Sequence, residues 1–221
     1  MSSNSHEIKI NSSTHLSCAS EPTIRVRRTF AARHLMAAKY HARAVEDIEN
    51  ENEGKPLGPH FDTASWNATA AIVLSFAAIE AALDEAAEDY GLPDNLGAAL
   101  ERAATLEKAQ AFLDYARVGP FDRGSEPFQS AELLRVIRNG LVHPKAEWDN
   151  AKDRNDKITA KIIGARLPLS PFWPDQSLAF PHGCMSAGTA LWATETARRF
   201  IVSFRNKLSL QIQKQLKDGT I

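Results

Sequence analysis

The longest apolar stretch of this chain, residues 64–90, most strongly limits the fold classes that the chain can adopt. Its hydrophobic residues recur every three to four positions, which is the periodicity of a helix rather than of a strand. Its stripe consists of Thr69, Val73, Phe76, Glu80, Leu83, Ala87 and Tyr90. Asp62 or Thr63 is placed to cap the start, and Gly91 and Pro93 end the run. We therefore expect a central core helix.

Four more runs share helical periodicity, and no run of alternating β-branched residues between turn markers predicts a strand. They cover residues 29–50, 96–117 with a restart at Thr105, 125–145, and 186–216. Ser186 is placed to cap the last helix, whose stripe is Ala190, Ala193, Ala197, Phe200, Phe204 and Leu208. The sequence predicts an all-α bundle of four to five helices.

The 221 residues, 43% hydrophobic and 24% charged, are ordinary for a soluble globular domain. Residues 1–22 are rich in Ser, Asn and Thr, so we expect a flexible N-terminal tail before one domain at 23–221. Within it, residues 145–185 are expected to be a loop-rich insertion before the last helix. Its Pro-rich part, 167–183, is expected to wrap over the core in an extended form through Phe172, Trp173 and Phe180.

Location and cofactors follow from what the sequence lacks. The least polar run, 68–79, is about half the length of a membrane span, and the tail lacks a signal-like apolar core, so we expect a cytoplasmic protein with no membrane association. Cys18 and Cys184 have no metal-ligand spacing. His34 and His41 stand two helical turns apart, roughly 10 Å, which is too far for one ion. No metal and no cofactor are expected.

A small polar constellation closes the helix predicted at 125–145, which Ser125 is expected to cap. Asn139 and His143 are four residues apart and share a face, while the long side chain of Arg138 reaches toward the same place. Spacing alone leaves an ordinary interpretation open, namely an ion-pair residue, a solvated amide and a histidine favoured by the helix dipole.

Gly140 lies inside the same predicted helix, where glycine costs roughly 1 kcal/mol relative to alanine. A glycine kept at that cost indicates that another part of the chain needs the space.

The run L-x-x-I-R-N-G-L-V-H-P around these residues resembles the signature of the HEPN domain family, the higher eukaryotes and prokaryotes nucleotide-binding domains. The motif of that family is an Arg, then a polar residue, then a His four to six residues after the Arg. Arg138, Asn139 and His143 match it. The long Ala-rich helix with I-E-A-A-L, placed before the motif helix, is similar to the order of elements in the family.

The resemblance implies one of two functions. Many HEPN domains are metal-independent endoribonucleases of toxin, defence or RNA-processing systems, and act as homodimers in which two motif copies face each other. Others keep the fold and serve as dimerisation modules or bind RNA or a protein partner without cutting. For this chain the resemblance implies a homodimer, with RNA and an antitoxin or another protein as candidate partners. In the first case His143 transfers protons and the RNA 2′-hydroxyl attacks to leave a 2′,3′-cyclic phosphate, while Arg138 stabilises charge and Asn139 orients the His or the phosphate.

Glu80 interrupts the apolar stripe of residues 64–90. A buried carboxylate needs a partner, and Arg138 is the obvious cation, although a small turn of the stripe would instead carry Glu80 to water.

The modest basic run downstream of the motif, together with Arg135 and Lys145, is the expected RNA-contacting surface, because the net charge of −1 excludes binding by bulk attraction. A helical scaffold with no nucleic-acid role is the third possibility.

Overall fold

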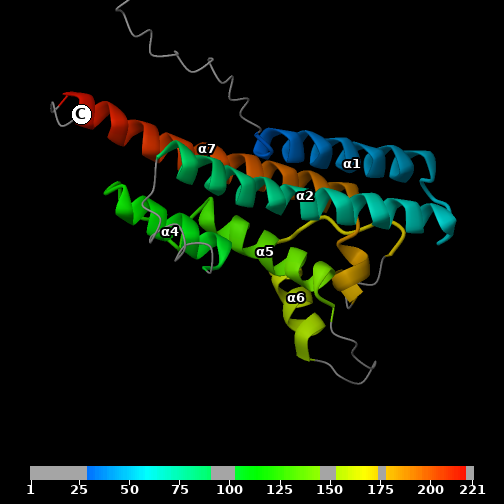
Figure 1. Ribbon diagram of the computed structural model, residues 1–221. Helices are drawn as coiled ribbons and strands as arrows, with labels where there is room; N and C mark the ends of the chain where they lie inside the picture. The colour runs from blue at the N-terminus through cyan, green and yellow to red at the C-terminus, as the bar shows by residue number, and fades with distance from the viewer. Residues whose placement is uncertain (1–28, 91–102, 145–152, 174–177, 218–221) are drawn as a thin grey trace, which may run out of the picture.

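A computed structural model describes residues 29–90, 103–144, 153–173 and 178–217, and all regular structure within these ranges is helical (Figure 1). The elements are α1 (Ala31–Glu51), α2 (Pro59–Asp89), α4 (Thr105–Tyr115), α5 (Phe128–Val142), α6 (Asp153–Gly164), the π-helical turn η2 (Ala179–Gly183) and α7 (Ala187–Lys217). The all-α prediction is confirmed. The helices outnumber the four to five expected, because α6 and η2 were not predicted.

Three long helices, α1, α2 and α7, pack side by side, and α4 and α5 lie against them on the side of α2 away from α1 (Figure 1). Small residues fill the contacts inside the three-helix layer: Ala38, Ala42, Ala68, Ala71, Ala78, Ala190 and Ala193 have no exposed surface. Because alanine projects only a methyl group, the three helix axes can approach closely. Larger side chains, Phe76, Phe112, Phe200 and Phe204, fill the wider space toward α4 and α5.

The start of α2 differs from the prediction, and its end agrees with it. The helix begins at Pro59, with Gly58 in an extended conformation before it, and no side chain caps it. Proline suits the first turn because its fixed φ is helical and its missing N–H would have no helical partner there. Asp62 and Thr63 thus lie inside the helix. Tyr90 ends it, as the Gly-Pro signal indicated.

The last helix was predicted correctly. The Ser186 Oγ accepts a hydrogen bond from the Thr189 N–H at 3.0 Å, which satisfies one of the free donors at the start of α7. The Glu49 carboxylate, from the end of α1, accepts a second from the Ala187 N–H at 3.0 Å. All six residues of the predicted apolar stripe of α7 are buried.

The segment before α7 is more helical than predicted. Phe172 and Phe180 are buried and Trp173 is half-buried, stacked on Phe61 with ring centroids 5.6 Å apart, so these aromatic residues do anchor the segment to the core. However, the predicted loop-rich insertion contains helix α6, and its Pro-rich part ends in the helical turn η2 instead of staying extended. The predicted tail at 1–22 and helix start at 96 lie outside the described residues, whereas the predicted restart at Thr105 is the observed start of α4.

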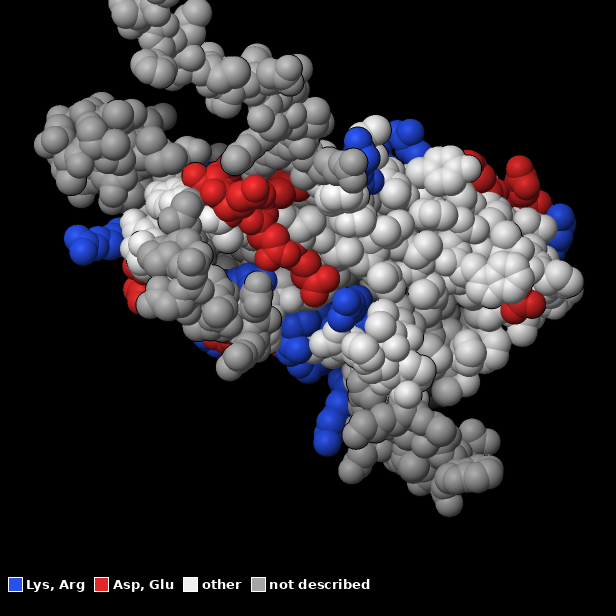
Figure 2. All heavy atoms as spheres, viewed as in Figure 1, with Lys and Arg blue, Asp and Glu red and all other residues white. Residues whose placement is uncertain are grey.

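The apolar part of α2 is longer than the run 68–79 that the sequence indicated. An 18-residue window has a mean hydropathy of 1.5, so by length and composition alone the helix is able to cross a membrane. Half of that window is buried inside the bundle. The rest contributes to an uncharged area on the face of the molecule seen in Figure 2. A cytoplasmic location stays a prediction.

Candidate functional site

The motif helix α5 begins at Phe128, three residues later than expected. Glu126 precedes a proline, which disfavours the helical conformation at Glu126 and keeps Ser125 outside the helix. Pro127 occupies the N-cap position and no side chain caps the helix, so the predicted Ser125 cap is wrong. The helix ends at Val142, and His143 is its C-terminal cap residue.

Gly140 allows two other elements to approach α5, as expected from a glycine kept inside a helix despite its low helix propensity. A Cβ atom built at Gly140 would lie 2.6 Å from Cζ of Phe180 and 2.9 Å from Cδ1 of Ile158. Phe180 belongs to η2 and Ile158 to α6, and both side chains are buried. Because Gly140 has no side chain, the C-terminal turn of α5 packs directly against α6 and η2.

Arg138 is held by groups on three sides. Its Nη1 donates a hydrogen bond to Asn139 Oδ1 at 2.9 Å, and its Nη2 lies 3.7 Å from Glu80 Oε2 in an ion pair. The guanidinium carbon is 5.5 Å from the ring centre of Phe76, a cation–π contact. Its Nε is buried and has no hydrogen-bond partner. The side chain is consequently fixed in direction with one donor still unsatisfied.

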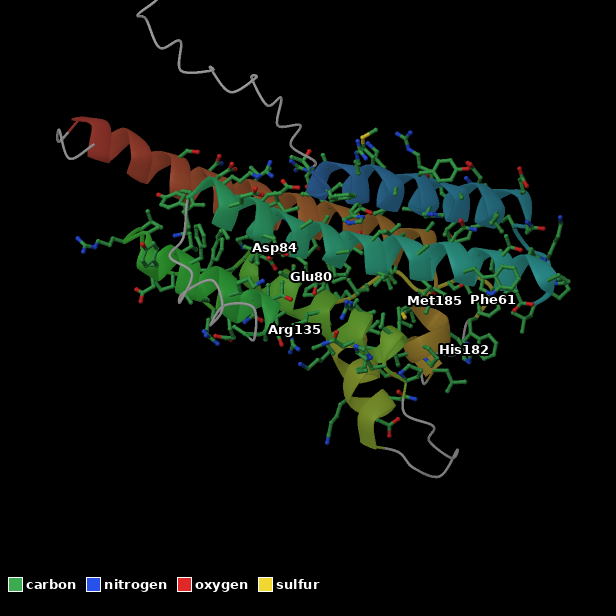
Figure 3. All side chains as sticks on the ribbon, viewed as in Figure 1. Phe61, Glu80, Asp84, Arg135, His182 and Met185 are labelled. Carbon is green, nitrogen blue, oxygen red and sulfur yellow. The ribbon has the colours of Figure 1, made fainter. Side chains whose placement is uncertain are left out.

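The predicted pairing of Glu80 with Arg138 is confirmed, and it is half-buried: 37% of the Glu80 side chain and 21% of the Arg138 side chain are exposed. The other carboxylate oxygen of Glu80 accepts a hydrogen bond from Thr105 Oγ1 at 3.1 Å. Figure 3 shows Glu80 and Asp84 on the side of α2 that faces α5 and its Arg135. Three helices, α2, α4 and α5, thus meet at this carboxylate.

Two contributors to this cluster, Phe76 and Thr105, were not predicted from the sequence. Phe76 stands one turn before Glu80 on the same face of α2, so its contact with Arg138 follows from the Glu80 pairing. Thr105 was identified only as a helix start. Nothing in its local sequence indicates that α4 approaches α2 at Glu80.

His143 and Asn139 are one turn apart, and the His143 N–H donates to the Asn139 C=O at 3.1 Å. The His143 side chain is exposed, and Asn139 is half-buried against Arg138. The structure therefore brings Glu80, Arg138 and Asn139 into one bonded cluster and places His143 at the exposed helix end beside it.

Arg135 lies one turn before Arg138 and is already paired. Its Nε donates to Glu132 Oε2 at 2.9 Å, and this hydrogen bonding raises the pKa of Arg135 above its ordinary value. Lys145, the other predicted RNA contact, lies outside the described residues. Lys108 is likewise bonded to Asp84 at 2.8 Å. Acidic and basic side chains accordingly lie next to each other on this face (Figure 2).

The described residues contain no group of three or more His, Cys, Asp and Glu side chains able to hold a metal ion. The chemistry available at the α5 terminus is that of an exposed imidazole, a fixed guanidinium and an amide. These groups are able to transfer protons and to stabilise an anion.

No protein-family model, curated protein or solved structure matches this chain. The resemblance to the HEPN domains consequently rests on the motif residues and the order of the helices alone.

Proposed function

We propose that this protein is a HEPN-type, metal-independent endoribonuclease of a toxin or defence system whose reactive groups are Arg138, Asn139 and His143. The observation that carries the proposal is the fixed cluster at the end of α5, in which Glu80 and Asn139 hold Arg138 next to the turn that bears the exposed His143. The polar residues of this cluster are bonded to one another across α2, α4 and α5, whereas polar residues that only keep a surface soluble need no such bonds.

The chemistry assigns one role to each group. The neutral His143 imidazole takes the proton of an RNA 2′-hydroxyl, or its protonated form donates one to the departing 5′-oxygen. The hydroxyl oxygen attacks the phosphorus, the bond to the 5′-oxygen breaks, and a 2′,3′-cyclic phosphate remains. Arg138 stabilises the negative charge that develops on the phosphate oxygens. Asn139 orients the guanidinium through its Oδ1.

Each chain supplies one His143, and the reaction uses an acid and a base. We therefore propose that the motif ends of two copies act together on one phosphate. The segment that follows the motif, including Lys145, is the proposed contact for the neighbouring phosphates.

A second candidate function, RNA or protein binding without cutting, is favoured by the pairing of the cations. Arg138, Arg135 and Lys108 each have a carboxylate partner within the chain. A phosphate has to compete with Glu80 for Arg138, which lowers the affinity of the site for RNA. A non-catalytic HEPN-like module would tolerate that competition, whereas an efficient nuclease has to overcome it.

Incubation of the protein with single-stranded and hairpin RNA in excess EDTA separates the two functions. Cleavage that persists in EDTA and falls about 100-fold or more in both His143→Ala and Arg138→Ala supports the nuclease. Arg199→Ala, which removes an exposed arginine of α7, is the matched control and should keep the wild-type rate. Circular dichroism verifies that each variant is folded.

Binding of RNA without any cleavage would favour the binding module. Cleavage that EDTA abolishes, or that His143→Ala leaves unchanged, would contradict the proposed nuclease site.

A further inference from the structure

The three most exposed large hydrophobic side chains of the described residues lie on α1 and the first half of α2. Met36, Tyr40 and Trp66 are 73%, 71% and 71% exposed. Single exposed hydrophobic residues are normal on a protein surface, but a contiguous group marks an interaction site. Whether these residues form one group depends on which way they point.

A hydrogen bond between the two helices settles the direction. His41 Nδ1 and Asn67 Oδ1 are 2.9 Å apart, so His41 and Asn67 face each other across the antiparallel pair α1 and α2. One residue earlier in a helix is a rotation of about 100°, and in antiparallel neighbours that rotation carries both side chains to the same side of the pair. Tyr40 and Trp66 therefore project from one common face.

The same face continues along α2. Val73 and Ala77 follow Trp66 by seven and eleven residues, which returns them to the same side of the helix, and both are only half-buried. This accounts for the part of the apolar window of α2 that the bundle leaves unburied. We name this surface the α1/α2 face, made of Met36, Tyr40, Trp66, Ala70, Val73 and Ala77.

Charges at the ends of the α1/α2 face are arranged for pairing with a copy of itself. Arg33, Tyr40 and Asp47 are spaced by seven residues and hence lie in one row on α1. Arg33 and Asp47 are exposed, and no described residue forms an ion pair with either. When a second α1 is laid antiparallel on the first with Tyr40 at the centre, each Arg33 meets an Asp47.

We infer that the α1/α2 face is a self-association surface on which a second copy of this chain docks through a two-fold axis near Tyr40. The axis sets Arg33 against the partner's Asp47 in two equivalent pairs. On α2 it sets the large Trp66 over the small Ala70 of the other copy, because the level of Tyr40 on α2 lies between those two residues. Charge and volume are then both complementary.

The size of the face predicts a weak, reversible contact. About 15 residues of each helix span roughly 21 Å, and two neighbouring helices are about 18 Å wide, which gives a projected area of roughly 400 Å² per copy. Stable dimers bury about 800 Å² per partner. We expect dissociation in the micromolar range.

An anionic membrane fits this face less well. Arg33, Lys39 and Arg43 would favour one, but the exposed acids Glu46, Asp47 and Asp62 lie near one end of the face and would repel it. A second copy satisfies cations and acids together. The α1/α2 face contains none of the motif residues, so the inference does not rest on the proposed nuclease function.

Sedimentation velocity on the full chain between about 5 and 100 μM tests the inference. The wild-type mass should rise with concentration, and Trp66→Glu should weaken that association at least about 10-fold, because it places a charge at the centre of the apolar contact. Val202→Glu is the matched control: Val202 is also an exposed apolar residue, 44% exposed, but it lies on α7. It should associate like the wild type.

A charge exchange makes the test specific. Arg33→Asp and Asp47→Arg should each weaken association, and the double variant should restore it. Rescue inside one chain is excluded, because the two residues are about 21 Å apart along α1. A monomeric wild type at 100 μM, or an association that Trp66→Glu leaves unchanged, would overturn the inference. So would a monomer that binds phosphatidylserine vesicles through Trp66, which would identify a membrane surface instead.

Discussion

Replacing Gly140 by alanine tests whether the end of the motif helix is held by close packing. The new methyl group would lie 2.6 Å from Phe180 Cζ and 2.9 Å from Ile158 Cδ1, distances that real Cβ atoms essentially never show. Neither neighbour is free to turn away, because both are 5% exposed. In addition, the Phe180 N–H donates to Thr159 Oγ1 on α6 at 3.2 Å.

Two opposing effects set the size of the change. Alanine in place of glycine inside a helix gains about 1 kcal/mol, and overpacking of a filled core costs about 1–3 kcal/mol. Because two buried side chains have to move at once, we place the cost near 2 kcal/mol. Gly140→Ala should thus destabilise the protein by about 1 kcal/mol, which corresponds to roughly 2–4 °C in Tm for a chain of this size.

Gly164→Ala is the matched control for the same substitution. Gly164 ends α6, and a Cβ atom there has no neighbour within 4 Å. Chemical unfolding in urea, followed by circular dichroism, should show Gly164→Ala equal to the wild type or slightly more stable. If Gly140→Ala were as stable as Gly164→Ala, then Phe180 and Ile158 would be free to move and the packing argument would be wrong.

Three smaller predictions concern single groups. Glu80→Ala should cost about 1 kcal/mol in urea unfolding, less than for a fully buried pair, because Glu80 and Arg138 remain 37% and 21% exposed; an unchanged midpoint would refute the pairing. Burial raises the pKa of Glu49 in the folded protein above its ordinary 4.5. The wild type therefore loses stability as the pH rises from 4.5 through the folded-state pKa, because the buried carboxyl group has to ionise. Glu49→Gln should be more stable than the wild type at pH 7 and should lose that advantage below about pH 4.5. Cys184 is fully buried and burial raises its thiol pKa to about 12, so in a Cys18→Ser background a thiol reagent should label it only after unfolding, and fast labelling of the native chain would contradict its burial.

Periodicity and local signals were enough for the long helices. The stripe of α7 and its Ser186 cap are determined by neighbours in the sequence, and the Glu80 pairing followed from one carboxylate in an apolar stripe. The cost of Gly140 also indicated a close contact. Its partners, Ile158 and Phe180, were not predictable, because contacts between elements distant in sequence leave no local pattern.

Helix α6 escaped prediction because its buried face is narrow. Ile158 and Ile162 are its buried residues in the described side chains, and charged residues surround them in the sequence. One pair spaced by four residues is too short a stripe to separate a helix from a polar loop. Thr105 was missed in the candidate site for a related reason: its role depends on where α4 meets α2.

The chemical nature of the RNA ends tests the central claim most directly. RNA cut by the purified protein in excess EDTA should carry 2′,3′-cyclic phosphate and 5′-hydroxyl ends, because the 2′-hydroxyl is the nucleophile and His143 handles its proton. RNA with 2′-deoxy residues throughout should stay intact. Products with 3′-hydroxyl and 5′-phosphate ends, or cleavage of the 2′-deoxy substrate, would show that water is the nucleophile and contradict the assignment of Arg138 and His143.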